Sequence, residues 1–497
     1  MPNKVLIVHG WSDTYKSFET LKQWLVTQGR QSSDIFLGNY QSMQDDVTFD
    51  DLAAGMQARL EALVNEHKIS LAPFSLDVIV QSTGGPVVRH WLHYYLTQIV
   101  RAPDPEQLCP IQRMIMLAPA NFGSRLAAQG KTPLAKLFKG GVSNGFETGK
   151  LILNGLELGS PTLWKMANDD LFADRAVYPC VPDRGPFVFI LSGTETYGEL
   201  KGFVAHGANE DGSDGTVRAS SASLESVKLN VDYKQAKGQL TVQRQVNKPF
   251  AFKLVEGKNH STIVPKDLAD TGHPTLGIIR ECLAINDSTA YQQLGDRFAD
   301  ENDRFYKRQR AAAHGVHAYQ QFVMHLIDEM GNDVPDYRVD FHVIDDGITS
   351  NSLTGANLRN LQEYQDLTAQ LQREVVVDVE PHTENSSYRA FFINMDALHA
   401  LEAAIAEKAR TSGRSVFIAM NIDAVGPTAS LSYNTDDLQY RHIEGILPPT
   451  NATQKVATFF KANTRRWSRL RSAAWPTIKY LRLWFETGAT APAGRTG

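Results

Sequence analysis

Three residues in the first 290 could together perform nucleophilic chemistry on an ester. They are Ser82, Asp214 and His260, and each lies in a turn-forming stretch beyond an apolar run. A serine hydroxyl is a poor nucleophile unless a base accepts its proton, and an imidazole oriented by a carboxylate is such a base. The residue types therefore predict a nucleophile, an acid and a base that meet in the fold.

Other residues compete for two of these roles. Asp211 is an alternative acid, and His206 or His273 is an alternative base. The Asp-rich turn could instead hold calcium, but Asp214 stands where a calcium loop needs glycine, so that interpretation is weak. We prefer Asp214 and His260 because each follows a predicted strand, where an enzyme built on a sheet places its chemistry.

Ser82 lies between two segments of different periodicity. Leu76 to Val80 is a short apolar run, which favours a strand buried on both faces. From Pro86 onward apolar residues recur every fourth position for four turns, which predicts a helix, and proline suits its first turn. We therefore expect a sharp strand-to-helix turn that lifts the hydroxyl above the sheet edge. The simpler interpretation is a plain loop closed by Gly84 and Gly85.

Four more apolar runs predict strands of the same sheet. The runs are Lys4 to Val8, one ending near Pro119, Phe187 to Leu191, and Phe250 to Leu254.

The motifs in this order resemble the lipase and esterase branch of the α/β-hydrolases. Bacterial lipases, GPI inositol-deacylase-like proteins and bacterial phospholipase effectors share this arrangement, and the resemblance covers roughly residues 1–285. It implies an α/β-hydrolase fold, which is a mostly parallel sheet with helices on both faces. It also implies Ser82 as nucleophile and Asp214 and His260 as its partners. The motifs that carry it are His9-Gly10, Gln81-Ser82-Thr83-Gly84-Gly85, Leu117 to Ser124, Ser213 to Val217 and Asn259-His260.

The resemblance also implies an oxyanion hole formed by the backbone amides of Trp11 and Thr83. Each donor of this kind stabilises the transition state by about 3–4 kcal/mol. His9 is interpreted as a structural hydrogen-bonding residue. One departure stands out: Val80 and Gln81 replace the glycine and histidine usual before the serine, and a larger Val80 would crowd the turn.

Composition sets limits on the cellular context. The formal net charge of −5 gives no general attraction to nucleic acid. No stretch of about 18 uncharged apolar residues predicts a membrane span, and the first strand begins too early for a signal peptide. Cys109, Cys180 and Cys282 form no Cys-x-x-Cys pair, so neither a zinc site nor a disulfide framework is indicated. We expect a cytoplasmic protein, or one exported without an N-terminal signal, that needs no metal or organic cofactor.

The 497 residues predict more than one domain. We expect a catalytic domain over 1–290, a helical connector over 291–334 and a β-rich accessory domain over 335–460. An insertion at about 125–185, with glycines between short apolar segments, is typical of a mobile cap over the site. Ordinary packing of a capping subdomain explains the same residues equally well.

The tail is expected over 461–497, and within it the stretch 465–485 carries six Arg or Lys residues interleaved with Trp, Tyr and aliphatic side chains. Such a basic aromatic tail suits the surface of an anionic membrane, or its rings pack on the protein while the arginines face water. Residues 488–497 are predicted to be an unstructured end.

These observations predict a serine hydrolase that cleaves lipid esters, as a lipase or phospholipase does, through an acyl-enzyme. The alternatives are a carboxylesterase or acyltransferase on non-lipid esters, and an inactive hydrolase fold that only binds. The expected partners are a lipid ester, a membrane surface contacted by the tail and, if the protein is an effector, an immunity protein. Nucleic acid is not an expected partner.

Overall fold

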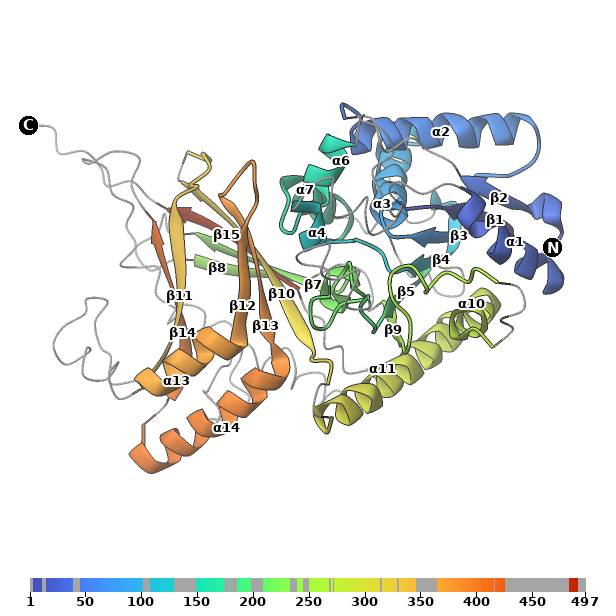
Figure 1. The fold of residues 1–497 in the computed structure, drawn as a ribbon. Coiled ribbons are helices and arrows are strands. Elements are labelled where there is room, and N and C mark those ends of the chain that lie inside the picture. The colour runs from blue at the N-terminus through green and yellow to red at the C-terminus, as the bar shows by residue number, and fades with distance from the viewer. Residues whose placement is uncertain are drawn as a thin grey trace, which may run out of the picture. The chain divides into compact units, whose positions relative to one another are not determined.

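The computed structural model forms two compact units (Figure 1). Unit 1 comprises Met1–Glu225 and Gln245–Val316, and unit 2 comprises Ser226–Arg244 and His317–Gly497. The residues that the structure describes are 3–10, 15–38, 45–101, 108–128, 149–173, 178, 186–197, 209–232, 239–244, 250–267, 270, 272–312, 315–328, 330–345, 364–414, 416–424 and 482–489.

Unit 1 is built on a six-stranded sheet in the order β2-β1-β3-β4-β5-β9. All five strand pairs are parallel, which confirms the predicted parallel sheet. Every strand predicted for this unit is present, and the one not predicted, β2, is a four-residue edge strand whose pattern is too short to recognise. The strands are β1 (Lys4–Val8), β2 (Ile35–Gly38), β3 (Leu76–Gln81), β4 (Ile111–Leu117), β5 (Phe187–Gly193) and β9 (Ala251–Val255).

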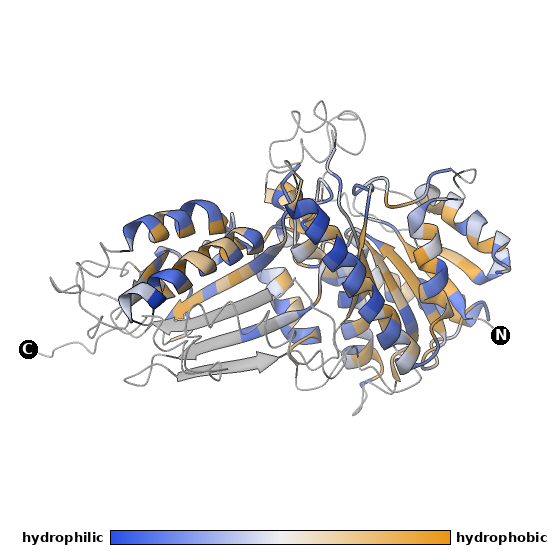
Figure 2. Ribbon diagram, turned by 90° about the horizontal axis from the view of Figure 1, so that it is seen from below, coloured by the Kyte–Doolittle hydropathy of each residue, from blue (hydrophilic) through white to orange (hydrophobic). Residues whose placement is uncertain are grey.

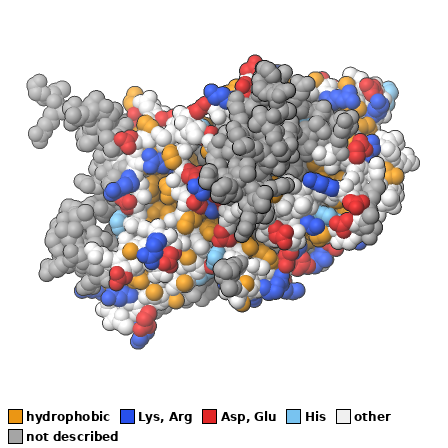
Figure 3. Space-filling model, viewed as in Figure 1, with side chains coloured by type: hydrophobic (Ala, Val, Ile, Leu, Met, Phe, Trp, Pro, Cys, Tyr) orange, Lys and Arg blue, Asp and Glu red, His pale blue; other side chains and the backbone are white. Residues whose placement is uncertain are grey.

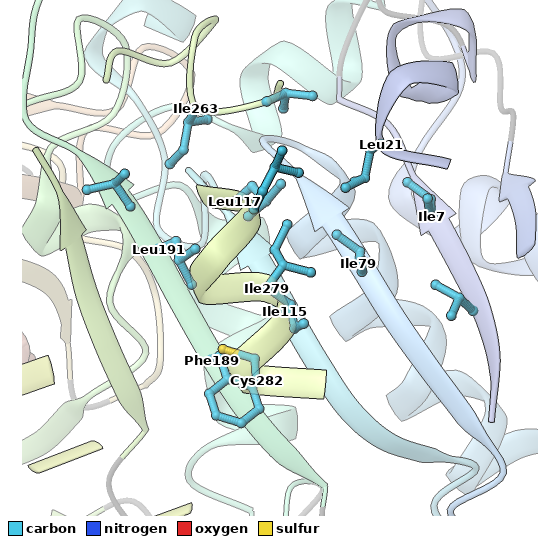
Figure 4. Close-up of a cluster of buried hydrophobic side chains, with 14 of the residues drawn as sticks. Ile7, Leu21, Ile79, Ile115, Leu117, Phe189, Leu191, Ile263, Ile279 and Cys282 are labelled. Atoms are coloured by element: carbon cyan, nitrogen blue, oxygen red, sulfur yellow. The ribbon is translucent and has the colours of Figure 1, made fainter. Parts of the chain in front are cut away.

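Helices cover both faces of this sheet. On one face α1 (Glu19–Thr27), α10 (Pro274–Ala284) and α11 (Ser288–Arg310) enclose a core of strand side chains, several of which are labelled in Figure 4. On the other face lie α2 (Phe49–Asn65) and α3 (Gly84–Tyr94). In Figure 2 the strands of this sheet are mostly hydrophobic and the helices carry both colours, as expected for strands buried between two amphipathic layers.

The insertion predicted at about 125–185 is described only in part. It contains α4 (Arg125–Ala128), α6 (Lys150–Gly155) and α7 (Pro161–Asp170), and residues 129–148 lie outside the described part. Most apolar side chains of α6 and α7 are buried in unit 1, for example Leu153 and Trp164. This burial agrees with the interpretation of a packed subdomain, and movement of a cap stays a prediction.

Unit 2 contains a mixed six-stranded sheet, in the order β12-β13-β10-β15-β7-β8, and a two-stranded sheet formed by β11 and β14. This confirms a β-rich second part of the chain, and the helix predicted around Leu398 is α14 (Met395–Ser412). Phe341 of β11 meets Phe391 of β13 with ring centroids 5.6 Å apart, so the small sheet packs on the large one. The strands are β7 (Ser226–Asp232), β8 (Gln239–Arg244), β10 (Tyr319–Asp328), β11 (Tyr337–Asp345), β12 (Val376–Pro381), β13 (Tyr388–Asn394), β14 (Val416–Ala424) and β15 (Arg482–Ala489), with the short helix α13 (Gln365–Gln370) between β11 and β12.

The boundaries of unit 2 differ from the sequence prediction in three places. Residues 226–244, expected in the catalytic domain, contribute β7 and β8 to the unit 2 sheet. The predicted helical connector is wrong over 319–328, which form β10. The predicted tail is wrong over 482–489, which form β15 between β10 and β7. The rest of 461–497 lies outside the described residues.

No helix in the described part of the chain combines the length and the apolar character that crossing a membrane requires. On the face shown in Figure 3, side chains of both charge signs are interspersed.

Candidate active site

Ser82 lies on a strained turn between β3 and α3, as predicted. Its φ of +53° is in the left-handed region, which a non-glycine residue rarely adopts. Three hydrogen bonds hold this conformation. The Ser82 amide donates to the Leu117 carbonyl at 3.0 Å, and the amides of Gly85 and Ala120 donate to the Ser82 carbonyl at 3.1 and 3.2 Å. The backbone strain is therefore supported from both β4 and α3.

Two glycines allow the turn to pack against the end of β1. A Cβ at Gly10 would lie 2.8 Å from the Ser82 Cβ, and a Cβ at Gly84 would lie 2.8 Å from the Val8 and His9 carbonyl oxygens. Both distances are shorter than any Cβ contact tolerates. Glycine is needed at both positions because any side chain there would collide with these neighbouring atoms. The two glycines therefore allow the turn at Ser82 to pack against the end of β1.

The residues that depart from the family pattern are accommodated. Val80 is fully buried in β3, in register with Val8 and Met116, so the strand accepts its larger side chain. Gln81 lies directed toward the base, with its Nε2 3.4 Å from the His260 carbonyl oxygen. The crowding expected at Val80 does not prevent the sharp turn at Ser82.

The structure brings the three predicted residues into one chain of contacts. His260 Nε2 lies 2.9 Å from Ser82 Oγ, and His260 Nδ1 lies 2.9 Å from Asp214 Oδ2. Both His260 and Asp214 are completely buried. A carboxylate at Nδ1 favours the tautomer protonated on that nitrogen, which leaves Nε2 free to accept the serine proton.

The Asp214 turn holds both the carboxylate and the base. The amides of Thr216 and Val217 donate to Asp214 Oδ1 at 3.0 and 2.8 Å, which leaves Oδ2 for the imidazole. The His260 amide donates to the Asp214 carbonyl at 2.8 Å. Acid and base are thus joined through both backbone and side chain, so their relative position does not depend on one contact.

Tyr197, which the sequence did not single out, links the loops that carry the acid and the base. Its hydroxyl lies 3.1 Å from Ser261 Oγ and 3.3 Å from Thr216 Oγ1. Burial raises the pKa of this phenol to about 12, so the hydroxyl keeps its proton across the physiological range. Tyr197 lies shortly beyond the end of β5, a position whose only sequence signal was a lone aromatic in a glycine-rich and acidic stretch.

The rival residues lie in other environments. The Asp211 carbonyl accepts a hydrogen bond from Arg218 Nε at 3.1 Å. His273 precedes α10, with its Nε2 2.9 Å from the Thr262 carbonyl oxygen. Neither contact involves Ser82, whereas Asp214 and His260 lead directly to it. His206 lies outside the described residues.

Of the two predicted oxyanion donors, Thr83 lies among the described residues and Trp11 does not. Thr83 is buried and immediately precedes α3, so its amide belongs to the helix end whose amides have no helical carbonyl partner. Trp11 lies outside the described residues. His9 is buried with Nδ1 2.7 Å from the Gly10 carbonyl oxygen, which agrees with a structural role.

A buried charge network behind the turn was missed by the sequence analysis. Arg89 of α3 donates from Nε and Nη2 to the two carboxylate oxygens of Asp170 in α7, at 2.8 and 3.0 Å. Arg89 Nη1 also donates to the Asn121 carbonyl at 2.8 Å, and the Tyr178 hydroxyl donates to Asp170 at 2.9 Å. Because Ala120 bonds to Ser82, this network fixes the loop that supports the nucleophile. An arginine within the apolar stretch of a predicted helix was its only sequence signal.

Within the described ranges, no cluster of three or more His, Cys, Asp or Glu side chains is placed to hold a metal ion. The contacts around Ser82 place its hydroxyl against an imidazole that a carboxylate orients.

The sequence matches no protein-family model and no curated protein. Among solved structures, the chain is similar to phospholipase PlaB from Legionella pneumophila, with a TM-score of 0.72 and 23% identity over 98% of this chain and 93% of that chain. The structure of that phospholipase in complex with thio-NAD gives the same TM-score and identity, over 99% and 94% of the two chains. A lipase from Bacillus licheniformis, BlEst2 in mature form, matches weakly, with a TM-score of 0.35 and 15% identity over 57% of this chain and 93% of that chain. The likeness to PlaB extends over both units, and the predicted α/β-hydrolase fold with a β-rich second part is confirmed.

Proposed function

We propose that this protein is a serine hydrolase that cleaves carboxylic esters of lipids. The observation that carries the proposal is the chain of two 2.9 Å contacts from Ser82 through His260 to Asp214. An alcohol, an imidazole and a buried carboxylate in this order form the arrangement that activates serine in acyl transfer.

The geometry suits a two-step reaction. His260 Nε2 accepts the proton as Ser82 Oγ attacks the ester carbonyl, and returns it to the leaving alcohol to give an acyl-enzyme. Asp214 holds the imidazole and stabilises its charged form. The Thr83 amide, with the Trp11 amide as the second donor, binds the oxyanion. Water, activated by the same imidazole, then releases the carboxylic acid.

The full-length likeness to an enzyme described as a phospholipase supports phospholipids as the substrate class. Non-lipid esters, with the chain acting as a carboxylesterase or acyltransferase, are the nearest alternative. A binding module without activity is less well supported, because Val80, its only sequence hint, leaves the contacts of Ser82 intact. Membrane contact through 461–497, an immunity protein as partner, and location in the cytoplasm or outside the cell stay predictions.

The test labels the protein with a fluorophosphonate probe and measures the products released from a mixed phospholipid and triglyceride emulsion by mass spectrometry. We expect labelling and fatty-acid release by the parent chain and by Ser33→Ala, which changes an exposed serine of unit 1. Ser82→Ala should abolish both. Labelling that persists in Ser82→Ala would assign the nucleophile elsewhere, and release of acids from water-soluble esters alone would favour the carboxylesterase alternative.

A further inference from the structure

A cavity of about 570 Å³ lies in unit 1 between α2 and the β1–β2 edge of the sheet. This volume is within the range of pockets that hold small molecules, and such pockets are mostly apolar. The inner wall is formed by buried aliphatic side chains from four elements. They are Leu6 and Val8 of β1, Ile35 of β2, Leu60 and Leu63 of α2, and Val87 of α3.

The helix α2 turns one continuous stripe toward this cavity. Its lining residues are 51, 52, 55, 56, 59, 60 and 63, which is the spacing of neighbours on one helical face. The other residues of this stripe all carry larger side chains than Gly55, which lies among them. A Cβ there would meet no atom within 4 Å, so space does not require a glycine. Because glycine in the middle of a helix lowers stability, its presence is best explained by the open volume it leaves.

The mouth of the cavity carries charges of both signs, and these groups differ in whether another group of the protein already contacts them. Asp51 accepts hydrogen bonds from the backbone amide and the hydroxyl of Thr48, at 2.9 and 2.6 Å, and so serves the α2 cap. Among the described residues neither Lys22 nor Arg59 forms a direct ion pair, although Arg59 lies within Coulombic range of Glu66, and Glu19 is the remaining carboxylate at the mouth. Two cations without a direct ion pair, at the mouth of an apolar cavity, favour an amphiphile with an anionic end.

The cavity shares its walls with the elements that position the nucleophile. Val8 ends the strand against which Gly84 packs, and Val87 lies one turn further along α3 on the same helical face. A molecule in the cavity would therefore contact both elements that hold the turn at Ser82, without occupying the contacts of Ser82 itself.

We propose that this cavity binds a free long-chain fatty acid, with its hydrocarbon chain against the aliphatic wall and its carboxylate near Lys22 and Arg59. The inference rests on the proposed function in one respect: hydrolysis of a lipid ester releases this ligand. The chemistry shared with the substrate is the acyl chain, so the experiments must separate a free acid from the chain of a bound ester.

The first experiment measures binding in the full-length Ser82→Ala protein, which does not depend on hydrolysis. The fluorescent fatty acid cis-parinaric acid is titrated into this protein and into the same protein carrying Gly55→Phe or Gly277→Phe. Gly277 is the matched control, because it lies in α10, outside the cavity, and a Cβ there also meets nothing within 4 Å. We expect Gly55→Phe to weaken binding by about tenfold or more and Gly277→Phe to leave it unchanged. Equal binding by all three proteins would overturn the proposal.

A second measurement tests the anionic end. Dodecanoate and dodecanol compete with cis-parinaric acid in the Ser82→Ala background, with and without the paired change Lys22→Gln and Arg59→Gln. We expect the paired change to weaken competition by dodecanoate about tenfold and to leave competition by dodecanol unaltered. If the alcohol and the acid compete equally in both proteins, the carboxylate is not recognised and the assignment of a fatty acid is wrong.

A third measurement identifies the source of the chain in the protein with an intact Ser82. For a site that holds a free acid, Gly55→Phe should change kcat/KM equally little for p-nitrophenyl butyrate and p-nitrophenyl dodecanoate. A loss confined to the dodecanoyl ester would place the substrate chain in the cavity and would overturn a separate fatty-acid site. A parent protein that binds cis-parinaric acid but hydrolyses neither ester would remove the proposed function and leave the binding site standing.

Discussion

The two ends of the unit 1 sheet each contain a buried aspartate joined to a basic side chain, but the two clusters differ in what they can do. At the amino ends of the strands, Asp77 of β3 accepts from Arg113 Nη1 at 2.7 Å and from Arg30 Nη2 at 3.1 Å. At the carboxyl ends, Asp214 holds His260, which in turn contacts Ser82.

The two clusters differ in whether the basic partner of the aspartate can gain and lose a proton near neutral pH. A guanidinium is charged at every physiological pH, so the Asp77 cluster cannot exchange protons and only fixes strands to neighbouring segments. Arg113 Nε also donates to the Ile285 carbonyl at 2.6 Å, which attaches β4 to the end of α10. An imidazole changes its charge near neutrality, and a serine can lose its proton to it. Under the proposed function, the same fold uses one carboxylate for rigidity and another to orient the base in proton transfer.

The largest expected effect comes from removing members of the carboxyl-end cluster. Ser82→Ala and His260→Ala should each lower kcat by about 10⁶-fold and Asp214→Asn by about 10⁴-fold, because the three act as one unit. The double change Ser82→Ala with His260→Ala should lose no more than either single change. Kinetics on a p-nitrophenyl ester measure these values, and losses that multiply would show that the two residues act separately.

The amino-end cluster should respond in stability and not in catalysis. Asp77→Ala leaves two arginines without their buried partner and should lower the free energy of unfolding by about 3–5 kcal/mol. Urea denaturation measures this loss, and kcat per folded molecule should match the parent. Asp214→Ala is the matched change at the other end. If it destabilised the protein as much as Asp77→Ala, or if Asp77→Ala abolished kcat, the distinction between the two ends would not hold.

This contrast also explains which parts of the site the sequence could predict. Ser82 was predictable because a strand pattern, a turn and a helix pattern meet there, and these are local signals. Asp214 and His260 were preferred over Asp211 and His273 on chain order and strand ends. Only the folded backbone, with the amides of 216 and 217 on one carboxylate, separates them. The Arg89–Asp170 pair joins segments 81 residues apart, and no local pattern reports such a contact.

The incorrect predictions about the fold, at β10 and β15, have a similar physical origin. In β10, Tyr319, Phe322 and Leu326 recur at helical spacing, and the first six residues of the strand are buried, so no two-residue alternation was visible. β15 pairs in parallel with both β10 and β7, which are distant in sequence. A strand of this kind is specified by partners on either side, and its basic and aromatic composition alone indicated a tail.

A third buried carboxyl, Glu225, sharpens the comparison because it has neither an arginine nor a histidine partner among its described contacts. Its Oε2 is buried without a hydrogen bond, and burial raises its pKa to about 8 from the usual 4.5. The folded protein therefore keeps a proton that the unfolded chain loses between these two values. Stability from this group is complete below pH 4.5 and is lost as the pH rises toward 8.

We expect the parent protein to lose on the order of a few kcal/mol of unfolding free energy between pH 5 and pH 8 through this group. Glu225→Gln keeps the neutral form at every pH, so its stability should change less over that interval and exceed that of the parent at pH 8. Urea unfolding at pH 5, 6.5 and 8 gives the comparison. Parallel pH profiles for parent and variant would show that the carboxyl ionises without cost.

The smallest expected effect is at Tyr197, which joins the loops of the acid and the base without contacting Ser82. Tyr197→Phe keeps the buried ring and removes the hydroxyl that lies near Ser261 and Thr216, so stability should fall by about 1 kcal/mol. If the hydroxyl also positions His260, kcat should fall by up to about tenfold while KM stays unchanged, since the loss would affect only the transition state. The two measurements must be made at a temperature where both proteins are fully folded. A drop in stability with an unaltered kcat would place Tyr197 with Asp77, among the groups that hold the fold and take no part in the alignment of acid and base.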